Sequence, residues 1–214
     1  MASHSSSFEN LSAKRETSRL ENLTDVVFGL ALSVSALSLV SSPPHTLAEA
    51  QDDILLFMFS FMILILVWTD YSEVMAVLPI ETHVALNLNM LMLFLVVLQP
   101  YLLYLLNQTG EQLIEFASVI YALDLGGLMV ISGFFHHELS VEEKKLVPAE
   151  SSSSYKRASR LLFISTAWFF LTALPQFWSL EIDDTPIRFY LWGGPLIISW
   201  ISQAAASMKR RAKP

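Results

Sequence analysis

Six apolar stretches, each long enough to cross a bilayer, dominate this 214-residue sequence. A transmembrane helix needs about 20 mainly apolar residues. Hydrophobic residues make up 53% of the chain and charged residues only 15%, whereas a soluble domain is about 25% charged. We therefore predict an all-α membrane protein with six transmembrane helices, at about residues 20–40, 54–78, 84–106, 115–135, 159–179 and 186–206.

The composition also narrows the chemistry that the chain can perform. The formal net charge of −7 is modest and spread out, which argues against a nucleic-acid partner. Cysteine is absent, which excludes a disulfide, a thiolate metal site and a cysteine nucleophile. The sequence has no evident nucleophile–base pair, phosphate-binding glycine loop or pair of carboxylates with a plausible cleft. We expect no enzymatic activity, no resident metal and no cofactor.

The basic residues predict the orientation of the bundle, because Lys and Arg collect in cytoplasmic loops. With six spans, every Lys and Arg except Arg188 falls on one side of the membrane. Both termini are then cytoplasmic, and the protein is a multi-pass protein of the cell membrane. The basic residues on that side are Lys14, Arg15, Arg19, Lys144, Lys145, Lys156, Arg157, Arg160, Lys209, Arg210, Arg211 and Lys213.

The chain divides into a bundle and two short ends. Residues 1–18 are rich in Ser and lack a periodic apolar pattern, so we predict a disordered cytoplasmic N-terminus. The transmembrane domain covers residues 19–207, and residues 208–214 form a basic cytoplasmic tail. The connection from His136 to Ala158 is predicted to be a solvated linker. The Gly193-Gly194-Pro195 run should bend or break the sixth span.

The first span carries a narrow stripe of apolar residues. At 100° per residue, Leu30, Val34 and Leu37 lie on one side of the helix, together with Leu23, Ser33 and Ser41, and Asp25 lies on the opposite side. Such a stripe packs against neighbouring helices in most proteins. A narrow apolar ring can also gate a pore by excluding water. Helical periodicity alone does not separate these two interpretations.

The residues that open this span resemble a known signature. The pattern Arg19-x-x-x-Leu23-Thr24-Asp25 resembles the R-x-x-x-F-S-D signature of the transmembrane protein 175 family of potassium channels. This resemblance implies a single six-span unit that assembles as a homotetramer, with the first helix of each subunit lining a central pore. It also implies a constriction made of bulky apolar side chains rather than a carbonyl filter.

The resemblance assigns roles to individual positions. Leu30 corresponds to the first gate layer, Val34 and Leu37 to two further layers, and Ser33 to a hydroxyl position in the pore, where Ser41 lies on the same stripe. A second patch is similar to the third span of the family and contains His83 and Asn87. In the family, the signature residues bond to this histidine and to a tryptophan at the base of the bundle. That structural network here comprises Arg19, Leu23, Thr24, Asp25, Trp68, His83 and Asn87.

We therefore predict a potassium-selective cation channel whose partners are further copies of itself, the lipid bilayer and permeant K⁺. An alternative is a proton-coupled secondary transporter that uses Asp124 at a midplane site, because a charge in mid-span is costly. Asp124 is otherwise a protonated or hydrogen-bonded acid packed against Ser or Tyr of a neighbouring span. A non-conducting membrane scaffold is a third possibility.

Five further ionisable residues are assigned no function from the sequence. The His136-His137-Glu138 run lacks the spacing of a metal site and is expected at a solvated or interfacial helix end. Asp70 and Glu73 are expected to pair with Arg19, with a lysine or with water.

Overall fold

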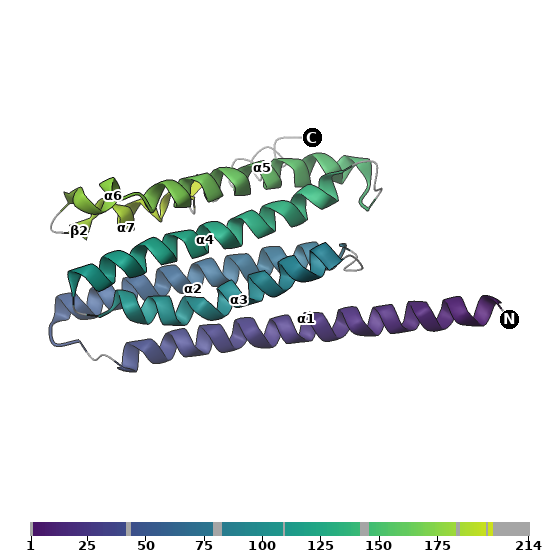
Figure 1. Cartoon of the computed structure of the whole chain (residues 1–214), viewed down its shortest axis with the longest axis horizontal. Coiled ribbons are helices and arrows are strands. Elements are labelled where there is room, and N and C mark those ends of the chain that lie inside the picture. The colour runs from purple at the N-terminus through teal and green to yellow at the C-terminus, as the bar shows by residue number, and fades with distance from the viewer. Residues whose placement is uncertain are drawn as a thin grey trace, which may run out of the picture.

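The computed structural model describes residues 2–41, 44–78, 83–108, 110–141, 146–182, 185–195 and 197–198, and its main feature is a bundle of long helices running side by side (Figure 1). A short antiparallel hairpin lies near the end of the described chain, with Glu181 opposite Pro186 and Ile182 opposite Thr185. The elements are α1 (Ala2–Ser41), α2 (Leu47–Met75), α3 (His83–Leu106), α4 (Glu111–Ser140), α5 (Ala149–Thr172), α6 (Gln176–Ser179), β1 (Glu181–Ile182), β2 (Thr185–Pro186) and α7 (Ile187–Leu191).

Three of these helices, α2, α3 and α4, are long and apolar enough to cross a membrane, and α1 contains a shorter apolar part, Asn22–Leu37. Local signals start and stop the helices. Thr46 caps α2, because its hydroxyl accepts a hydrogen bond from the Glu49 amide at 3.2 Å. Gly110 precedes α4 with a φ of 128°, a conformation that L side chains rarely adopt.

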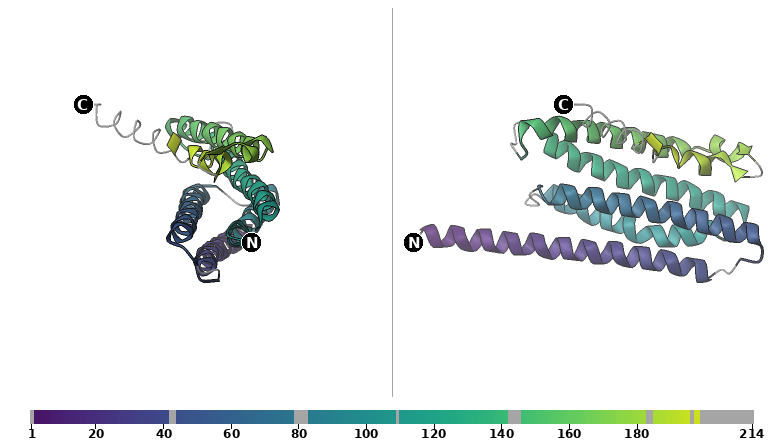
Figure 2. Two further views of the ribbon diagram at one scale, coloured as in Figure 1. Left: turned by 90° about the vertical axis from the view of Figure 1, so that its left-hand side faces the viewer. Right: turned by 180° about the vertical axis from the view of Figure 1, so that it is seen from behind.

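The helices are arranged around α4. It packs against α5 on one side and against α3 and α2 on the other, and α1 packs against α3 and α2. The two outer positions of the bundle are therefore taken by α1 and by α5 with the short C-terminal elements (Figures 1 and 2). The core between the helices is apolar and aromatic, and its fully buried side chains include Phe28, Leu64, Met92, Tyr121, Leu125, Phe169 and Trp192.

The N-terminal segment differs from the prediction, because residues 2–18 are helical rather than disordered. They continue α1 beyond the end of the bundle (Figure 1). No Gly or Pro occurs between residues 2 and 28. Adding residues to an existing helix is much easier than nucleating a new one, so the apolar part of α1 provides a nucleus from which the polar segment extends.

The connection between the fourth and fifth predicted spans is also shorter than predicted. Helix α4 continues to Ser140 and α5 begins at Ala149, so most of the expected linker is helical. The serine run is packed rather than solvated at Ser152, whose hydroxyl donates to the Ser140 carbonyl at 2.9 Å. Because this hydroxyl is paired with the end of α4, it holds the two helices together close to their turn.

The last third of the chain is broken into short elements. Helix α5 ends at Thr172, before Pro175, which lacks the amide hydrogen needed to continue a helix. Helix α7 ends at Leu191, next to the Gly193-Gly194-Pro195 run, as predicted. Residues 199–206 of the predicted sixth span and the predicted tail at residues 208–214 lie outside the described residues.

Candidate functional site

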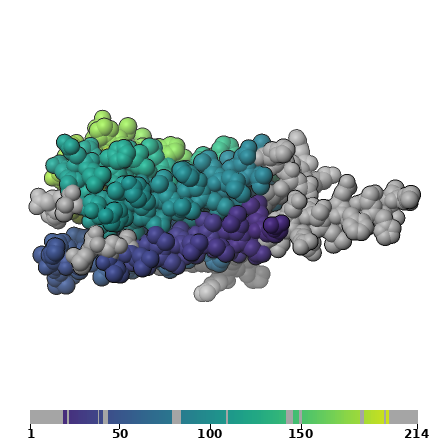
Figure 3. All heavy atoms as spheres, turned by 60° about the horizontal axis from the view of Figure 1, so that its bottom comes forward, coloured from purple at the N-terminus to yellow at the C-terminus, as the bar shows by residue number. Residues whose placement is uncertain are grey.

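Helix α1 has two faces with opposite surroundings. Thr24, Phe28 and Ala31 are buried against the rest of the bundle, at most 4% exposed. Their spacing of four and then three residues places them on one side of the helix. The predicted gate residues lie on the other side, where Leu30 is 60%, Val34 48% and Leu37 61% exposed. The space-filling view shows α1 uncovered along one edge of the molecule (Figure 3).

The exposed stripe is therefore a row of large apolar side chains, each about half exposed or more among the residues that the structure describes. Leu23 is also on the surface, 48% exposed. Ser33 is exposed and donates its hydroxyl hydrogen to the Gly29 carbonyl at 2.8 Å. Its oxygen remains able to accept a hydrogen bond from water or to contact a cation. The side chain of Ser41 lies outside the described residues.

The side of α1 that lies away from the apolar stripe is bonded to α2 through the signature residues. The Trp68 indole Nε1–H donates to Asp25 Oδ1 at 2.9 Å. Thr24 Oγ1 donates to the Leu20 carbonyl at 2.9 Å and lies 3.3 Å from the Tyr71 hydroxyl. Because a threonine hydroxyl has one hydrogen, Tyr71 is the donor in the second contact. The structure thus brings Thr24 and Asp25 together with two aromatic residues of one turn of α2.

The other residues of the predicted network are more dispersed. Arg19 is exposed on α1 and Asn87 is exposed on α3. His83 begins α3, but its side chain lies outside the described residues. Asn89, two residues after Asn87, is fully buried. The sequence pattern indicates an asparagine-rich turn without identifying which asparagine faces the bundle.

Breaking the contact between α1 and α2 should have a modest and measurable cost. Trp68→Phe removes the indole donor, and Asp25→Ala removes the acceptor. A double-mutant cycle of the two should give a coupling of about 1 kcal/mol, the net value of one hydrogen bond in a protein. Thermal unfolding of the purified protein measures it. Purely additive effects of the two substitutions would show that this bond does not hold α1.

Asp124 has a buried partner in the next helix. It is 3% exposed in the middle of α4, and Gln99 Nε2 of α3 donates to its Oδ2. The sequence suggested Ser or Tyr as the packing partner of Asp124, and the partner observed is a glutamine. Helix α4 is continuous through Asp124 and the Gly126-Gly127 pair. The carboxyl group thus joins two packed helices.

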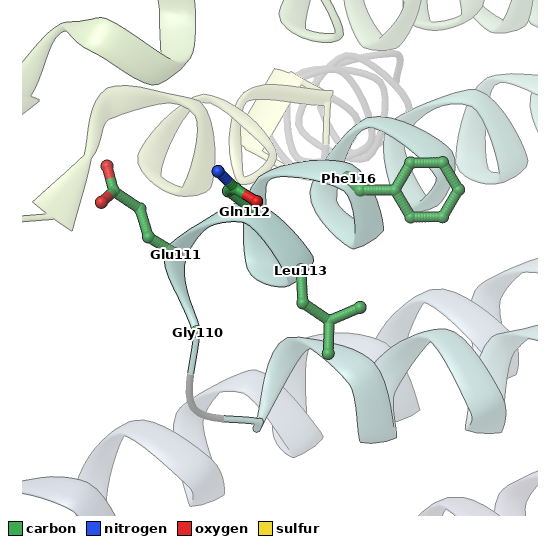
Figure 4. A pocket seen from close by; sticks show the side chains of 5 residues that line it. All are labelled: Gly110, Glu111, Gln112, Leu113 and Phe116. Carbon is green, nitrogen blue, oxygen red and sulfur yellow. The ribbon is translucent and has the colours of Figure 1, made fainter.

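A pocket lies elsewhere, at the start of α4 (Figure 4). It is a superficial depression, and all of its lining residues are exposed. Among the lining residues Glu111 is the only ionisable one, so the pocket offers no cluster of groups for catalysis. The lining residues are Gly110, Glu111, Gln112, Leu113 and Phe116.

Two polar residues have surroundings that differ from the sequence prediction. His136 is 6% exposed, not solvated, and its Nε2 lies 3.2 Å from Oδ1 of Asp70. Asp70 was expected to pair with Arg19, a lysine or water. The contact depends on how α2 and α4 are rotated against each other, which a single sequence does not reveal. Within the described residues, no group of three or more His, Asp or Glu side chains could hold a metal ion.

Comparisons with known proteins agree with the resemblance of the first three predicted spans. Residues 19–100 match the family model described as the endosomal/lysosomal potassium channel TMEM175. The fold is similar to the crystal structure of a lysosomal potassium-selective channel TMEM175 homolog from Chamaesiphon minutus, with a TM-score of 0.57 and 20% identity, covering 90% of this chain and 98% of that chain.

A second crystal structure with a similar fold is that of a variant of the potassium channel MtTMEM175 in complex with a nanobody–MBP fusion protein. The TM-score is 0.60 and the identity is 17%, and the match covers 89% of this chain and 93% of that chain. No curated protein sequence matches the chain significantly. The predicted resemblance is confirmed over residues 19–100, and so is the prediction of an all-α membrane protein. The number of spans and their orientation stay predictions.

Proposed function

We propose that this chain is a potassium-selective channel of the transmembrane protein 175 family. The observation that carries the proposal is the division of α1 into a bonded face and an exposed apolar face. Thr24 and Asp25 bond to α2, whereas Leu30, Val34 and Leu37 are about half exposed or more. The match of residues 19–100 to the potassium-channel family model supports this assignment of α1.

The working unit is a homotetramer in the cell membrane. Each subunit contributes six spans with both termini in the cytoplasm, in accordance with the distribution of Lys and Arg. Four copies of α1 then surround a central axis. The similarity of the fold to two potassium-channel structures over about nine-tenths of the chain supports this architecture.

The constriction consists of three stacked rings from the exposed stripe of α1. Leu30 to Leu37 covers about 10 Å along the helix, at 1.5 Å per residue. Apolar rings of this kind exclude water until they widen, and an ion must lose part of its hydration shell to pass. Ser33 adds a hydroxyl oxygen near the first ring, and Ser41 adds another beyond the last.

The bonded face of α1 keeps the rings in register with the rest of the subunit. Asp25 and Thr24 are about one and a half turns from Leu30 and attach α1 to Trp68 and Tyr71 of α2. Arg19 lies further toward the cytoplasmic mouth. The resemblance also assigns His83 and Asn87, at the start of α3, to this network. No cofactor takes part, and K⁺ is the permeant ion.

Recording from reconstituted protein in planar bilayers tests the channel against the transporter. We expect a potassium current that reverses near the potassium equilibrium potential under opposed K⁺ and Na⁺ gradients. Asp124→Asn should retain that current within about twofold, because an amide can keep the contact with Gln99. A saturating flux that needs a proton gradient and is abolished by Asp124→Asn would favour the transporter. The absence of any potassium current would overturn the channel.

A further inference from the structure

A second polar contact lies at the end of the bundle where α2 and α4 both finish. His136 of α4 is almost completely buried, and its Nε2 lies 3.2 Å from Oδ1 of Asp70 on α2. Its other ring nitrogen, Nδ1, lies 3.0 Å from the carbonyl oxygen of Ser132, one turn earlier in α4. Both ring nitrogens therefore face oxygen atoms at hydrogen-bonding distance.

These two contacts fix the number of protons at the site. A carbonyl oxygen can only accept a hydrogen bond, so Nδ1 must carry a hydrogen. The contact with Asp70 then needs one more proton, either on Nε2 facing an ionised carboxylate or on the carboxyl group facing a bare Nε2. In both cases the Asp70–His136 pair binds one proton beyond those of a neutral imidazole and a free carboxylate.

Other ionisable groups lie around the pair. Glu73 lies one turn after Asp70 on α2 and acts on its carboxyl group as a like charge. On α4 the neighbouring ionisable groups are His137 and Glu138. From α5, the Tyr155 ring packs against the imidazole, with centroids 5.8 Å apart. The basic side chains of α5 near this end are exposed to solvent, namely Lys156, Arg157 and Arg160.

The same turn of α2 also holds the first helix. Trp68 and Tyr71 flank Asp70 in sequence and contact Asp25 and Thr24 of α1. The Tyr71 ring also lies against Phe135, the residue before His136, with centroids 6.5 Å apart. One turn of α2 thus touches α4 on one side and α1 on the other. Trp68 and Tyr71 therefore connect the contact with α4 to α1.

We propose that the Asp70–His136 pair is a proton-binding site that controls the position of α1 and hence conduction. Gain or loss of the proton changes the contact between Asp70 of α2 and His136 of α4. Helix α2 is bonded to α1 in the same turn, so α1 shifts with it. This inference rests on the proposed channel function. The ligand is the proton itself, and histidine commonly changes charge between about pH 5 and 8.

The test compares potassium currents at matched pH on both sides of the bilayer, from about pH 5 to 8. In the wild type we expect the current to change about fivefold or more, the lower end of ordinary allosteric coupling. His136→Gln keeps a hydrogen-bonding side chain but cannot titrate in this range, so its current should not vary with pH. Asp70→Asn provides a second variant that removes the charge and should lose the response too. His137→Gln, the exposed neighbour, should respond as the wild type does.

Nitrogen NMR of the histidine side chains measures the protonation state of His136 independently of conduction. At neutral pH, His136 should show either two protonated ring nitrogens or a proton shared with Asp70. A potassium current whose pH response is the same in the wild type and in His136→Gln overturns the inference and leaves the channel intact. If the wild type conducts potassium at no pH, both the proposed channel function and the regulatory role are wrong. The NMR spectrum then decides whether the Asp70–His136 pair binds the proton.

Discussion

Leu30→Asn is expected to raise the potassium conductance about tenfold, the largest functional change that a single substitution on α1 should produce. Leu30 forms the first proposed ring, and its side chain is 60% exposed in the single subunit. An asparagine in each of four subunits offers water hydrogen-bonding partners inside the constriction. A barrier lowered by about 1.4 kcal/mol, comparable to one net hydrogen bond, corresponds to about tenfold in rate. Single-channel recording in symmetrical K⁺ measures the change.

Selectivity should fall in the same variant. Exclusion of sodium depends on the cost of removing water from the ion, and a wetted ring lowers that cost for both ions. The permeability ratio of K⁺ to Na⁺, obtained from the reversal potential under opposed gradients, should therefore move toward one. Leu30→Ala should change conductance or selectivity in the same direction and by less, because alanine widens the ring without adding a polar group.

Two controls separate wetting of the pore from a general effect on the helix. Leu30→Ile preserves volume and apolar character, so its conductance should stay within about twofold of the wild type. Ala36 is exposed on the same helix but about 120° away from Leu30. Ala36→Asn therefore adds the same amide outside the stripe and should leave the current unchanged. Equal changes in conductance for Leu30→Asn and Ala36→Asn would show that the stripe does not line the ion path.

The face of α1 that carries this prediction could be derived from the sequence. Within one helix, the relative direction of two side chains depends only on their separation and the 100° step. That step is sufficient to group Leu30, Val34 and Leu37 and to separate them from Asp25. The resemblance added Trp68 as the partner, and the structure joins its indole to Asp25. Sequence alone left open what covers the stripe, because an apolar row looks the same whether it meets a helix, lipid or a pore.

Contacts between helices were less accessible to prediction. The pairing of Asp70 with His136 requires the rotation and height of α2 and α4 to be known together, and a periodic pattern gives each helix only separately. Helix α5 begins earlier than the predicted fifth span for a local reason. Within the serine run at residues 151–154, which is typical of a solvated linker, Ser152 is buried and its hydroxyl donates to the Ser140 carbonyl at 2.9 Å.

Arg188 is the clearest case of a residue whose role emerges only from the fold. In the sequence it is the exception to the one-sided distribution of basic residues, and no role is predicted for it. In the structure it is fully buried at the start of α7. Its Nε donates to the Thr172 carbonyl at 2.7 Å, and Nη1 donates to the Ser118 hydroxyl at 2.5 Å. Its other terminal nitrogen, Nη2, donates to the carbonyls of Ala173 and Leu174 at 3.2 and 3.0 Å.

These bonds satisfy the end of α5, where helix carbonyls have no amide partners within the helix. The positive charge also lies at the negative end of the helix dipole. The Trp178 ring covers the guanidinium, with 5.7 Å between its carbon and the ring centroid. Arg188 therefore fastens α7 to α5 and, through Ser118, to α4.

Arg188→Met should consequently cost at least about 3 kcal/mol of folding stability, because methionine fills part of the space but removes the donors to the Ser118 hydroxyl and to the Thr172 and Ala173 carbonyls. For a chain of this size, that loss lowers the thermal midpoint by about 6–12 °C. Arg188→Lys should be intermediate, since an ammonium group cannot reproduce the planar fork of donors. Arg160→Met, at an exposed position of α5, should change the midpoint little. A midpoint for Arg188→Met equal to that of Arg160→Met would mean that the buried hydrogen bonds only offset the cost of removing the guanidinium from water.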